Sequence, residues 1–358
     1  MYRGPLMRVG ILFGGRSAEH DVSIMSARSI VAVLDRTRYS VVLMAIDKWG
    51  RWWFDEEAQA LLQHGSTAMS PPQAALAPAD LLPPVERLAE VDICIPVLHG
   101  PFGEDGTVQG LFEIAGIPYV GCGVAASAVA MDKVIAKNVF RAHGLPILPF
   151  TVVSRRRWEQ WPEATVAGVE SVLTYPMFVK PANLGSSVGI TKVRNASDLR
   201  GALATAARYD AKIVVEQGIE AREIEVSVLG NDAPQASVPG EILPSREFYS
   251  YEAKYLDDAS ELLIPAPLTA EQIGRVQDIA LKAFRSIDGT GLARVDFLMD
   301  RETGQIYLNE VNTFPGFTRI SMYPKLWEAS GIPYTRLLDT LIALGMERHA
   351  ERQRNTIA

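Results

Sequence analysis

The sequence lacks several features that mark whole classes of protein. It has only two cysteines, Cys94 and Cys122, in 358 residues, and they match neither a disulfide framework nor a metal-binding spacing. No apolar run approaches the ~20 residues of a membrane-spanning helix, and Met1–Val9 has no signal-peptide core. We therefore expect a cytoplasmic protein with no membrane partner, in which both thiols are buried and reduced.

Basic stretches are also missing. The 35 lysines and arginines are outnumbered by 42 aspartates and glutamates, which gives a formal net charge of -7. There is no basic tail and no basic stripe with interleaved aromatic residues, so nucleic acid is not expected as a partner. The remaining composition is ordinary for a globular enzyme, with 48% apolar and 22% charged residues. A chain of this length predicts about two or three domains.

The first part of the chain has the pattern of an α/β unit. A short apolar run, Arg8–Phe13, leads through Gly14-Gly15 into a helical pattern over residues 18–34. Further segments continue this pattern: strands at Val41–Ile46 and Val91–Leu98, a loop at Ser66–Pro84, and a helix at Leu111–Ala115 that ends at Gly116. We place this amino-terminal α/β domain at residues 1–121.

Two further domains are predicted after residue 121. The smaller one, residues 122–216, combines helices at Met131–His143 and Ser197–Tyr209 with strands at Phe178–Lys180, Ile190–Val193 and Ile213–Glu216. The larger one, residues 217–358, combines a half-buried antiparallel strand at Glu223–Leu229, a hairpin of Leu292–Met299 and Gln305–Val311, and helices at Thr269–Ile287 and Pro333–Glu347.

The predicted hairpin carries a set of oxygen ligands. Side chains alternate along a strand, so Arg294 and Asp296 share one face, as do Glu310 and Asn312. If Met299, which ends the first strand, pairs with Gln305, which begins the second, the even-numbered residues of both strands point the same way. Asp296, Glu310 and Asn312 then converge as hard ligands that suit Mg²⁺. The alternative is a solvated hairpin face with an Arg–Glu pair, which leaves the amide and the following Thr-Phe-Pro-Gly turn unexplained.

A glycine- and serine-rich turn offers a place for phosphate. After Lys180-Pro181, the segment Asn183-Leu-Gly-Ser-Ser-Val-Gly189 supplies backbone N–H groups and hydroxyls beside a lysine. The pattern G-x-x-x-x-G-K-[ST] is absent, and such turns are also common in plain hairpins. Lys133 and Lys254 would complete a set of three cations around a polyphosphate. The alternative is that each lysine is an ordinary surface residue.

Two loops that follow predicted strands offer groups for a small zwitterion. Ligands of open α/β sheets bind at the carboxyl ends of strands. Glu19 follows the first strand and could hold an ammonium group, although acid in the first turn of a helix is also favourable on its own. His99 follows a buried strand beside glycines, which makes it a ligand candidate, although a single histidine is more often structural.

Taken together, these motifs and their order resemble the D-alanine–D-alanine ligase family, over nearly the whole chain. The motifs are Gly-Gly-Arg-Ser-Ala-Glu-His-Asp-Val-Ser (14–23), His-Gly…Gly-Glu-Asp-Gly (99–106), Met-Asp-Lys (131–133), Lys-Pro…Gly-Ser-Ser-Val-Gly (180–189), Glu-Phe-Tyr-Ser-Tyr-Glu-Ala-Lys-Tyr (247–255), Arg-Val-Asp-Phe (294–297) and Asn-Glu-Val-Asn-Thr-Phe-Pro-Gly-Phe-Thr (309–318). The resemblance implies an ATP-grasp fold, in which a Rossmann-like amino-terminal α/β domain precedes two α+β subdomains that enclose ATP. It also implies a homodimer.

The resemblance assigns a role to each matching residue. Those implied for ATP are Lys133, Lys180, Ser187 and Lys254 at the phosphates, Glu216, Gln217 and Ile219 at the adenine, and Glu223 at the ribose. Those implied for magnesium, present as two ions and replaceable by manganese, are Asp296, Glu310 and Asn312. Those implied for the two D-alanines are Glu19 at the first ammonium, His99 near the first carboxylate, and Ser321 with the Met322 backbone at the second carboxylate.

The implied reaction has two steps and serves peptidoglycan precursor synthesis. The first D-alanine carboxylate attacks the γ-phosphate of ATP to give an acyl phosphate, and the second amine then attacks that carbonyl. Arg294 and the Gly316 N–H would stabilise the oxyanion, a contribution of ~3 kcal/mol per donor. Ser186 and Tyr255, with Glu19, would form a hydrogen-bonded triad. The loop at 244–254 would close over the intermediate, because water would hydrolyse an acyl phosphate.

Three alternatives to this function differ in the residues they require. A depsipeptide-forming relative that takes D-lactate would have Tyr255 replaced, although Met322, where leucine is common, lies at the second-substrate pocket. Another ATP-grasp enzyme would have no need of Glu19, His99 and the 247–255 loop. A non-catalytic nucleotide-binding module would have a broken metal or lysine set, and none is broken.

Overall fold

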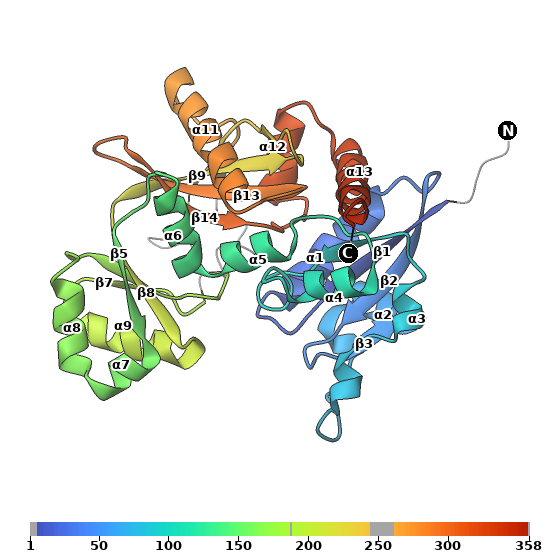
Figure 1. Ribbon diagram of the computed structural model, residues 1–358, viewed down its shortest axis with the longest axis horizontal. Helices are drawn as coiled ribbons and strands as arrows, with labels where there is room; N and C mark the ends of the chain where they lie inside the picture. The colour runs from blue at the N-terminus through green and yellow to red at the C-terminus, as the bar shows by residue number, and fades with distance from the viewer. Residues whose placement is uncertain (1–5, 187, 244–260, 357–358) are drawn as a thin grey trace.

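The protein contains three β-sheets, each with its own apolar core (Figure 1). The computed structural model describes residues 6–186, 188–243 and 261–356. Within those ranges, no helix has the length and apolar character needed to cross a membrane. The mixed α/β class predicted from the sequence is confirmed.

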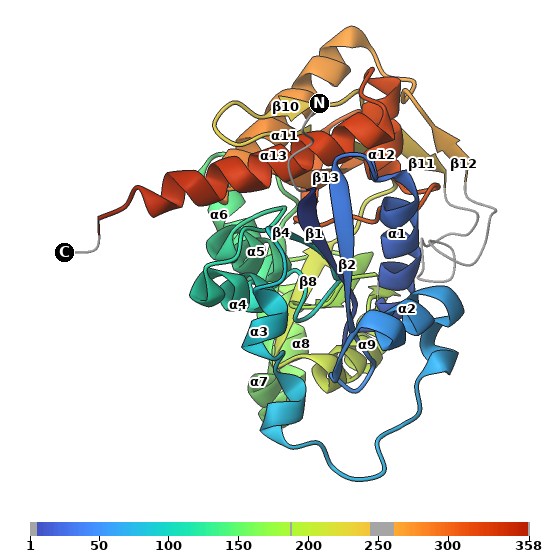
Figure 2. The same ribbon diagram turned by 90° about the vertical axis from the view of Figure 1, so that its right-hand side faces the viewer.

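The amino-terminal sheet has the strand order β3-β2-β1-β4, with β1 parallel to both of its neighbours. Its strands are β1 (Met7–Gly14), β2 (Tyr39–Ile46), β3 (Trp52–Phe54) and β4 (Ile93–Val97). The accompanying helices are α1 (His20–Val33), α2 (Asp55–His64), α3 (Val85–Leu88) and α4 (Thr107–Ala115), with short 3-10 turns at Gly65–Ala68 and Pro78–Leu81. The predicted loop around residues 66–84 projects from this part of the molecule (Figure 2).

The small middle sheet is antiparallel, in the order β5-β8-β6-β7. Its strands are β5 (Phe150–Ser154), β6 (Met177–Pro181), β7 (Thr191–Val193) and β8 (Lys212–Gln217). One face is covered by α7 (Arg155–Gln160), α8 (Pro162–Glu170) and α9 (Ala196–Tyr209) (Figure 1). The opposite face is therefore available to form a site.

The large carboxy-terminal sheet has the order β12-β11-β9-β13-β14, with β10 paired to β9. Its strands are β9 (Ala221–Leu229), β10 (Gln235–Ala236), β11 (Gly240–Leu243), β12 (Glu261–Leu263), β13 (Leu292–Asp300) and β14 (Ile306–Asn312). Its apolar core is shared with α5 (Val124–Met131), α6 (Lys133–Ala142) and α11 (Ala270–Ser286). On the other face, α12 (Met322–Ala329) contacts β9, where the Tyr323 hydroxyl donates to Val228 O at 3.0 Å.

The last helix, α13 (Tyr334–Gln353), returns to the amino-terminal part of the molecule (Figure 2). Its buried leucines at 337, 338 and 341 belong to the same apolar cluster as β1 and β4. The cluster also contains Phe314 and Phe317, which follow β14. The amino-terminal sheet and the chain after β14 are thus packed into one core.

Four sequence predictions need correction. β9 is not half-buried: its last six residues are all buried, because it is a central strand between β11 and β13. The helix predicted over 131–143 is broken at Asp132, whose side chain caps α6. The helix predicted from residue 18 begins at His20, after a turn, and α13 continues past 347 to Gln353.

The hairpin register differs from the prediction by one residue at the turn. Met299 pairs with Ile306 rather than with residue 305, so core-facing residues have odd numbers in β13 and even numbers at the start of β14. A bulge between this pairing and the Asp296–Glu310 pair shifts the register. The bulge lets both Asn309 and Glu310 face the same cavity.

Candidate active site

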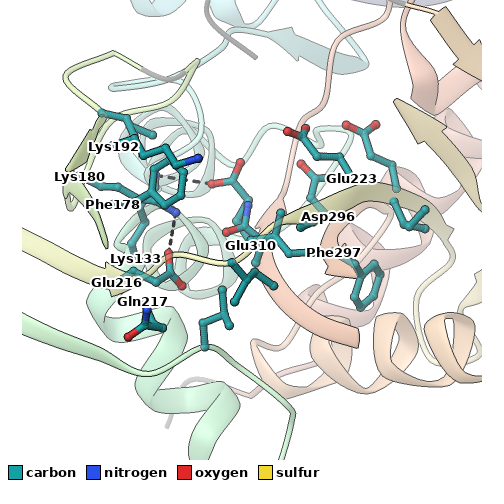
Figure 3. A pocket seen from close by; sticks show the side chains of 18 of the residues that line it. Lys133, Phe178, Lys180, Lys192, Glu216, Gln217, Glu223, Asp296, Phe297 and Glu310 are labelled. Carbon is teal, nitrogen blue, oxygen red and sulfur yellow. Dashed lines mark hydrogen bonds and ion pairs between the residues drawn. The ribbon is translucent and has the colours of Figure 1, made fainter. Parts of the chain in front are cut away.

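A cavity of about 520 Å³ lies between the middle sheet and the large sheet. Its size falls in the range of ~300–1,000 Å³ that is typical of small-molecule sites. On one side lie Lys133, Lys180 and Lys192, and on the other lie Glu223, Asp296 and Glu310 (Figure 3). Cations thus face carboxylates across a space large enough for a nucleotide.

Lys133 connects the two sides of the cavity. It is the first residue of α6, where Asp132 accepts backbone N–H groups from Val134 (3.0 Å) and Ile135 (3.1 Å). Lys133 Nζ donates to Leu184 O at 2.7 Å and lies 3.6 Å from Glu310 Oε2. The helix cap therefore places Lys133 between the glycine- and serine-rich turn and the hairpin.

Glu216 is held by two buried lysines. Lys180 Nζ lies 2.6 Å from Glu216 Oε2, and Lys137 donates to Oε1 of the same carboxylate. Burial opposes the charge on Glu216, but the two ammonium groups outweigh it and lower its pKa to about 2. Burial lowers the pKa of Lys137. Burial also opposes the charge on Lys180, but the charge and the hydrogen bond of Glu216, together with more distant carboxylates, outweigh it and raise the pKa of Lys180. The three groups form one charged cluster, of which Lys180 and Glu216 line the cavity.

Lys137 was missed by the sequence analysis. It is fully enclosed and follows Lys133 by one helical turn, so both lysines project from the same side of α6. A lysine at i+4 among apolar positions could have been noticed. Its partner could not, because Glu216 is 79 residues away in the sequence.

The segment after β8 continues along the cavity. All four residues predicted for an adenine and ribose site line the cavity: Glu216, Gln217, Ile219 and Glu223. The Gln217 side chain points elsewhere: its Nε2 donates to Thr174 O at 2.9 Å. The segment before β6 therefore holds the side chain of Gln217 in place.

The hairpin brings its polar residues onto one face. Arg294 Nε and Nη2 each lie 2.7 Å from an oxygen of Asp296, and Nε is 2.9 Å from Glu225 Oε2. Asn312 Nδ2 donates to Asp296 Oδ2 at 2.9 Å. Glu310 pairs with Asp296 in the backbone register. Glu225 on β9 is a further acid that the sequence analysis did not single out.

The chemistry of this donor set fits a hard divalent cation. Two carboxylates and one amide oxygen would leave several positions for water and phosphate, which is how Mg²⁺ is commonly bound. Among the described residues, no group of three or more His, Cys, Asp and Glu side chains converges as a complete metal site. The cation would therefore depend on phosphate oxygens as well as on the protein.

Glu19 contacts the glycine- and serine-rich turn that follows β6. The Ser186 hydroxyl donates to Glu19 Oε1, although the two residues are 167 positions apart. Ser186 has a φ of 49°, in the left-handed region that non-glycine residues rarely adopt. A Cβ on Gly100 or on Gly185 would lie 2.9 Å from Glu19 Oε2. Glycine on both sides thus leaves room for the carboxylate.

His99 and Glu104 lie next to Glu19 and contact the chain after β14. His99 Nδ1 is 3.1 Å from Phe314 O, and burial lowers the pKa of His99. Glu104 accepts the N–H of Gly100 at 2.7 Å and the N–H of Phe314 at 3.2 Å. Burial, and then the charge of Glu19, raise the pKa of Glu104 to about 8. Glu104 belongs to a quoted sequence motif, but its own role was not predicted.

Ser321 and Met322 lie at the start of α12. Ser321 Oγ accepts the N–H of Thr318 at 3.0 Å and is 2.8 Å from Thr318 Oγ1. A Cβ on Gly316 would lie 2.8 Å from Ser321 Oγ, so these two residues are adjacent. The Met322 side chain is buried with Ile242, which leaves its backbone N–H at the helix amino terminus.

The described site residues fall into two adjoining groups. One lines the cavity, and the other lies around Glu19, Gly316 and Ser321, with Ser186 belonging to both. Three predicted residues, Ser187, Lys254 and Tyr255, lie outside the described residues, as does the whole of the loop at 244–254.

Comparison with known proteins matches nearly the whole chain to one family. Residues 8–122 match the family model described as D-ala D-ala ligase N-terminus, and residues 139–343 match the one described as D-ala D-ala ligase C-terminus. The chain is 53% identical over 353 residues to the D-alanine--D-alanine ligase of Heliobacterium modesticaldum, covering 97% of this chain and 96% of that protein. It is 47% identical to that of Natranaerobius thermophilus, covering 98% of each.

Solved structures agree with these matches. The D-alanine-D-alanine ligase from Coxiella burnetii superposes with a TM-score of 0.81 at 36% identity, covering 98% of this chain and 97% of that chain. The VanG D-Ala:D-Ser ligase from Enterococcus faecalis also gives 0.81, at 33% identity, covering 95% of this chain and all of that one.

Proposed function

The chain belongs to the D-alanine–D-alanine ligase family, and on this premise we propose how its residues divide the work of the reaction. It is an ATP-dependent, ADP-forming ligase of the ATP-grasp fold that joins two D-alanines for peptidoglycan precursor synthesis. The observation that carries the residue assignments is the Ser186–Glu19 hydrogen bond. It joins the nucleotide cavity to the group of residues suited to a small zwitterion.

ATP occupies the cavity between the middle and large sheets. The backbone at Glu216–Ile219 meets the adenine, and Glu223 accepts the ribose hydroxyls. Lys133 and Lys180 neutralise the phosphates, and Ser187 and Lys254 remain proposed phosphate contacts outside the described residues. The geometry across the cavity supports this assignment, because lysines from one side and carboxylates from the other both face the space between them (Figure 3).

Asp296, Glu310 and Asn312 hold magnesium, which manganese can replace, with two ions per site. When bound, the metal supplies positive charge to the phosphate oxygens. The protein's own contribution is to bring the three side chains together through the hairpin register. Arg294, already paired with Asp296, lies beside them.

The first D-alanine binds with its ammonium at Glu19 and its carboxylate near His99. The carboxylate oxygen attacks the γ-phosphorus, and ADP leaves with the electron pair of the broken P–O bond.

The three proposed domains, residues 1–121, 122–216 and 217–358, each supply part of this site. Ser186, and Tyr255 outside the described residues, complete the triad that ties the turn to Glu19.

The second D-alanine binds with its carboxylate at Ser321 and the Met322 N–H. Its amine, after losing a proton, attacks the acyl carbon and forms the C–N bond of a tetrahedral intermediate. That intermediate then loses a second proton from nitrogen and expels phosphate with the electron pair of the broken C–O bond. Arg294 and the Gly316 N–H stabilise the oxyanion of the tetrahedral intermediate. Closure of the loop at 244–254 would exclude water, which would otherwise compete with the amine.

We also propose that the protein is a cytoplasmic homodimer. The buried, unpaired thiols of Cys94 and Cys122 suit a reducing compartment. Ile114 on α4 is 90% exposed, which suits a surface that a second copy could cover. Sedimentation of the purified protein at micromolar concentration should give the mass of two chains, and a single-chain mass at that concentration would contradict the dimer.

The function is tested by ATP-dependent phosphate release with D-alanine, L-alanine, D-serine and D-lactate, each with and without Mg²⁺. Release should be fastest with D-alanine and should require the cation. Similar product from D-lactate and D-alanine at neutral pH would indicate a depsipeptide ligase. Activity with L-alanine but not with D-alanine would contradict the assignment altogether.

A further inference from the structure

The turn at residues 314–317, which follows β14 and carries Gly316, is bound by side chains at both of its ends. Phe314 N–H donates to Glu104 Oε1 at 3.2 Å, and Phe314 O lies 3.1 Å from His99 Nδ1. Phe317 N–H donates to Ser26 Oγ at 3.2 Å, and Phe317 O accepts from the Tyr334 hydroxyl at 2.6 Å. Every backbone polar group of the two phenylalanines therefore has a side-chain partner.

Ser26 links the two ends of this turn. It is fully buried on α1, and its Oγ lies 3.3 Å from His99 Nε2. Because Nδ1 faces a carbonyl oxygen, Nδ1 carries the proton and Nε2 is an acceptor. The Ser26 hydroxyl therefore donates to Nε2 and accepts from the Phe317 N–H. The result is a continuous chain of hydrogen bonds from Phe317 N–H through Ser26 and His99 to Phe314 O.

Packing restricts the turn on both sides and leaves its centre open. Phe314 is 3% exposed and Phe317 is fully buried, in one apolar cluster with the amino-terminal sheet. The Phe317 ring lies 5.3 Å from that of Tyr323 and 5.4 Å from that of Phe314. Gly316, between them, is partly exposed and adjacent to Ser321. The two anchored residues thus fix where the intervening N–H can point.

We propose that Ser26 is a positioning residue for the ligation step, because with His99 it holds the 314–317 turn so that the Gly316 N–H meets the oxyanion. This inference rests on the proposed function of Gly316. A fixed donor contributes more to the transition state than a mobile one, since no reorganisation is needed when charge develops. The amino-terminal domain then has a part in the second step as well as in binding the first D-alanine.

Ser26→Ala tests this inference, with Ser29→Ala as the matched control. Ser29 is on the same helix, but its hydroxyl donates only to Met25 O in that helix. Ser26→Ala removes the donor to His99 and leaves the Phe317 N–H buried without an acceptor. We expect kcat to fall about tenfold while KM for ATP stays within about twofold, because the nucleotide cavity is untouched. Ser29→Ala should match the wild type in both.

A second measurement separates positioning from a general structural role. In ATP labelled with ¹⁸O at the β,γ-bridge, reversible phosphoryl transfer scrambles the label, so the ratio of scrambling to dipeptide formation reports which step is slow. This ratio should rise about tenfold in Ser26→Ala, because ligation slows and phosphoryl transfer does not. Loss of thermal stability and ATP affinity with an unchanged ratio would overturn the inference, as would wild-type kinetics.

Ser26→Cys tests whether the volume of the side chain, rather than its hydroxyl group, accounts for the effect. The thiol fills the same space but is a weak hydrogen-bonding group, so this variant should resemble Ser26→Ala in kcat and in the scrambling ratio. Full recovery of wild-type kinetics would show that packing alone matters and would overturn the inference. Dipeptide synthesis by the wild type and by Ser29→Ala is independent of these outcomes, so failure of the proposed function would be recognised separately.

Discussion

At the scale of single residues, Arg294 has two kinds of interaction: ion pairs with carboxylates, and a proposed contact with the oxyanion. Its guanidinium is bidentate to Asp296 and also contacts Glu225, so it neutralises carboxylates at the edge of the nucleotide cavity. In the proposed mechanism it also faces the oxyanion. The first interaction contributes to the stability of the fold, whereas the second would contribute to the rate.

Arg294→Ala should therefore lower kcat by about 10²–10³-fold, as expected for loss of an oxyanion donor. The Kd for ATP should change by no more than about threefold, because the adenine and phosphate contacts are separate. Stopped-flow nucleotide binding and steady-state turnover give the two values. Arg275→Ala, on the exposed side of α11, serves as the control. Loss of ATP affinity equal to the loss of kcat would mean that the role of Arg294 is misassigned.

Thr318 supports Ser321 through its backbone and its hydroxyl. Thr318→Val keeps the shape but removes one hydrogen bond, with a net value of about 1 kcal/mol. We expect KM for the second D-alanine to rise about fivefold, with KM for ATP unchanged. Thr340→Val is the control, because the Thr340 hydroxyl donates only to Arg336 O in its own helix. An equal effect in both variants would count against a role for Ser321 in binding.

At the scale of elements, the amino terminus of α6 determines where Lys133 lies. Asp132 accepts two backbone N–H groups there, and removal of such a cap typically costs about 1 kcal/mol. Asp132→Ala should lower the free energy of unfolding by at least that amount, because it also removes the ion pair of Asp132 with Lys212, and it should weaken ATP binding several-fold. Asp132→Asn, which can still cap, should lose less of both.

The matching control for this prediction is the cap of α11. Thr269 and Gln272 form a capping box, and neither residue lines the cavity. Thr269→Ala should destabilise the protein by about 1 kcal/mol while leaving the Kd for ATP unchanged. If the two variants lose equal stability and equal ATP affinity, the cap of α6 has no special role in the site. Chemical denaturation and calorimetric titration measure the two quantities.

Elements with strong local signals were predicted well, and elements defined by distant partners were not. The strand and turn at residues 7–15 and the helix ending at Gly116 follow from apolar runs and glycines, and both are confirmed. The burial of β9 depends on its two neighbouring strands, which no local pattern reveals. The hairpin was predicted, but its bulge was not, because alternation alone does not show where an extra residue enters.

The candidate site shows the same division. Residues in recognisable motifs, such as Glu19 and Asp296, could be named from the sequence, and their roles are proposals. Ser26 could not be named, because its partner Phe317 is 291 residues away and a buried serine on a helix has no sequence signature. Glu104 and Phe314 are likewise 210 residues apart.

At the scale of the whole molecule, a buried polar cluster joins elements that are far apart in the sequence. The buried cluster of Glu216, Lys137 and Lys180 joins α6 to the middle sheet. Since the pKa of Glu216 is lowered from 4.5 to about 2, its charge stabilises the fold above pH 4.5. This contribution is lost as the pH falls through about 2, when the folded protein also takes up the proton.

The effect of Glu216→Gln on stability should therefore depend on pH. At neutral pH we expect a loss of about 3–5 kcal/mol in the free energy of unfolding, because two buried lysines lose their partner. The difference from the wild type should shrink as the pH is lowered from 4.5 toward 2. Glu302→Gln, in the exposed hairpin turn, should show no difference at either pH. A difference for Glu216→Gln that is constant with pH would contradict the charged cluster.

The central claim is that ATP in the cavity between the middle and large sheets activates a D-alanine carboxylate as an acyl phosphate. It is tested most directly with D-alanine labelled with ¹⁸O in both carboxylate oxygens. Because the attacking oxygen stays on phosphorus when the amine displaces phosphate, one labelled oxygen should appear in each phosphate released, in equal amount to the dipeptide. Unlabelled phosphate formed together with dipeptide would contradict the account.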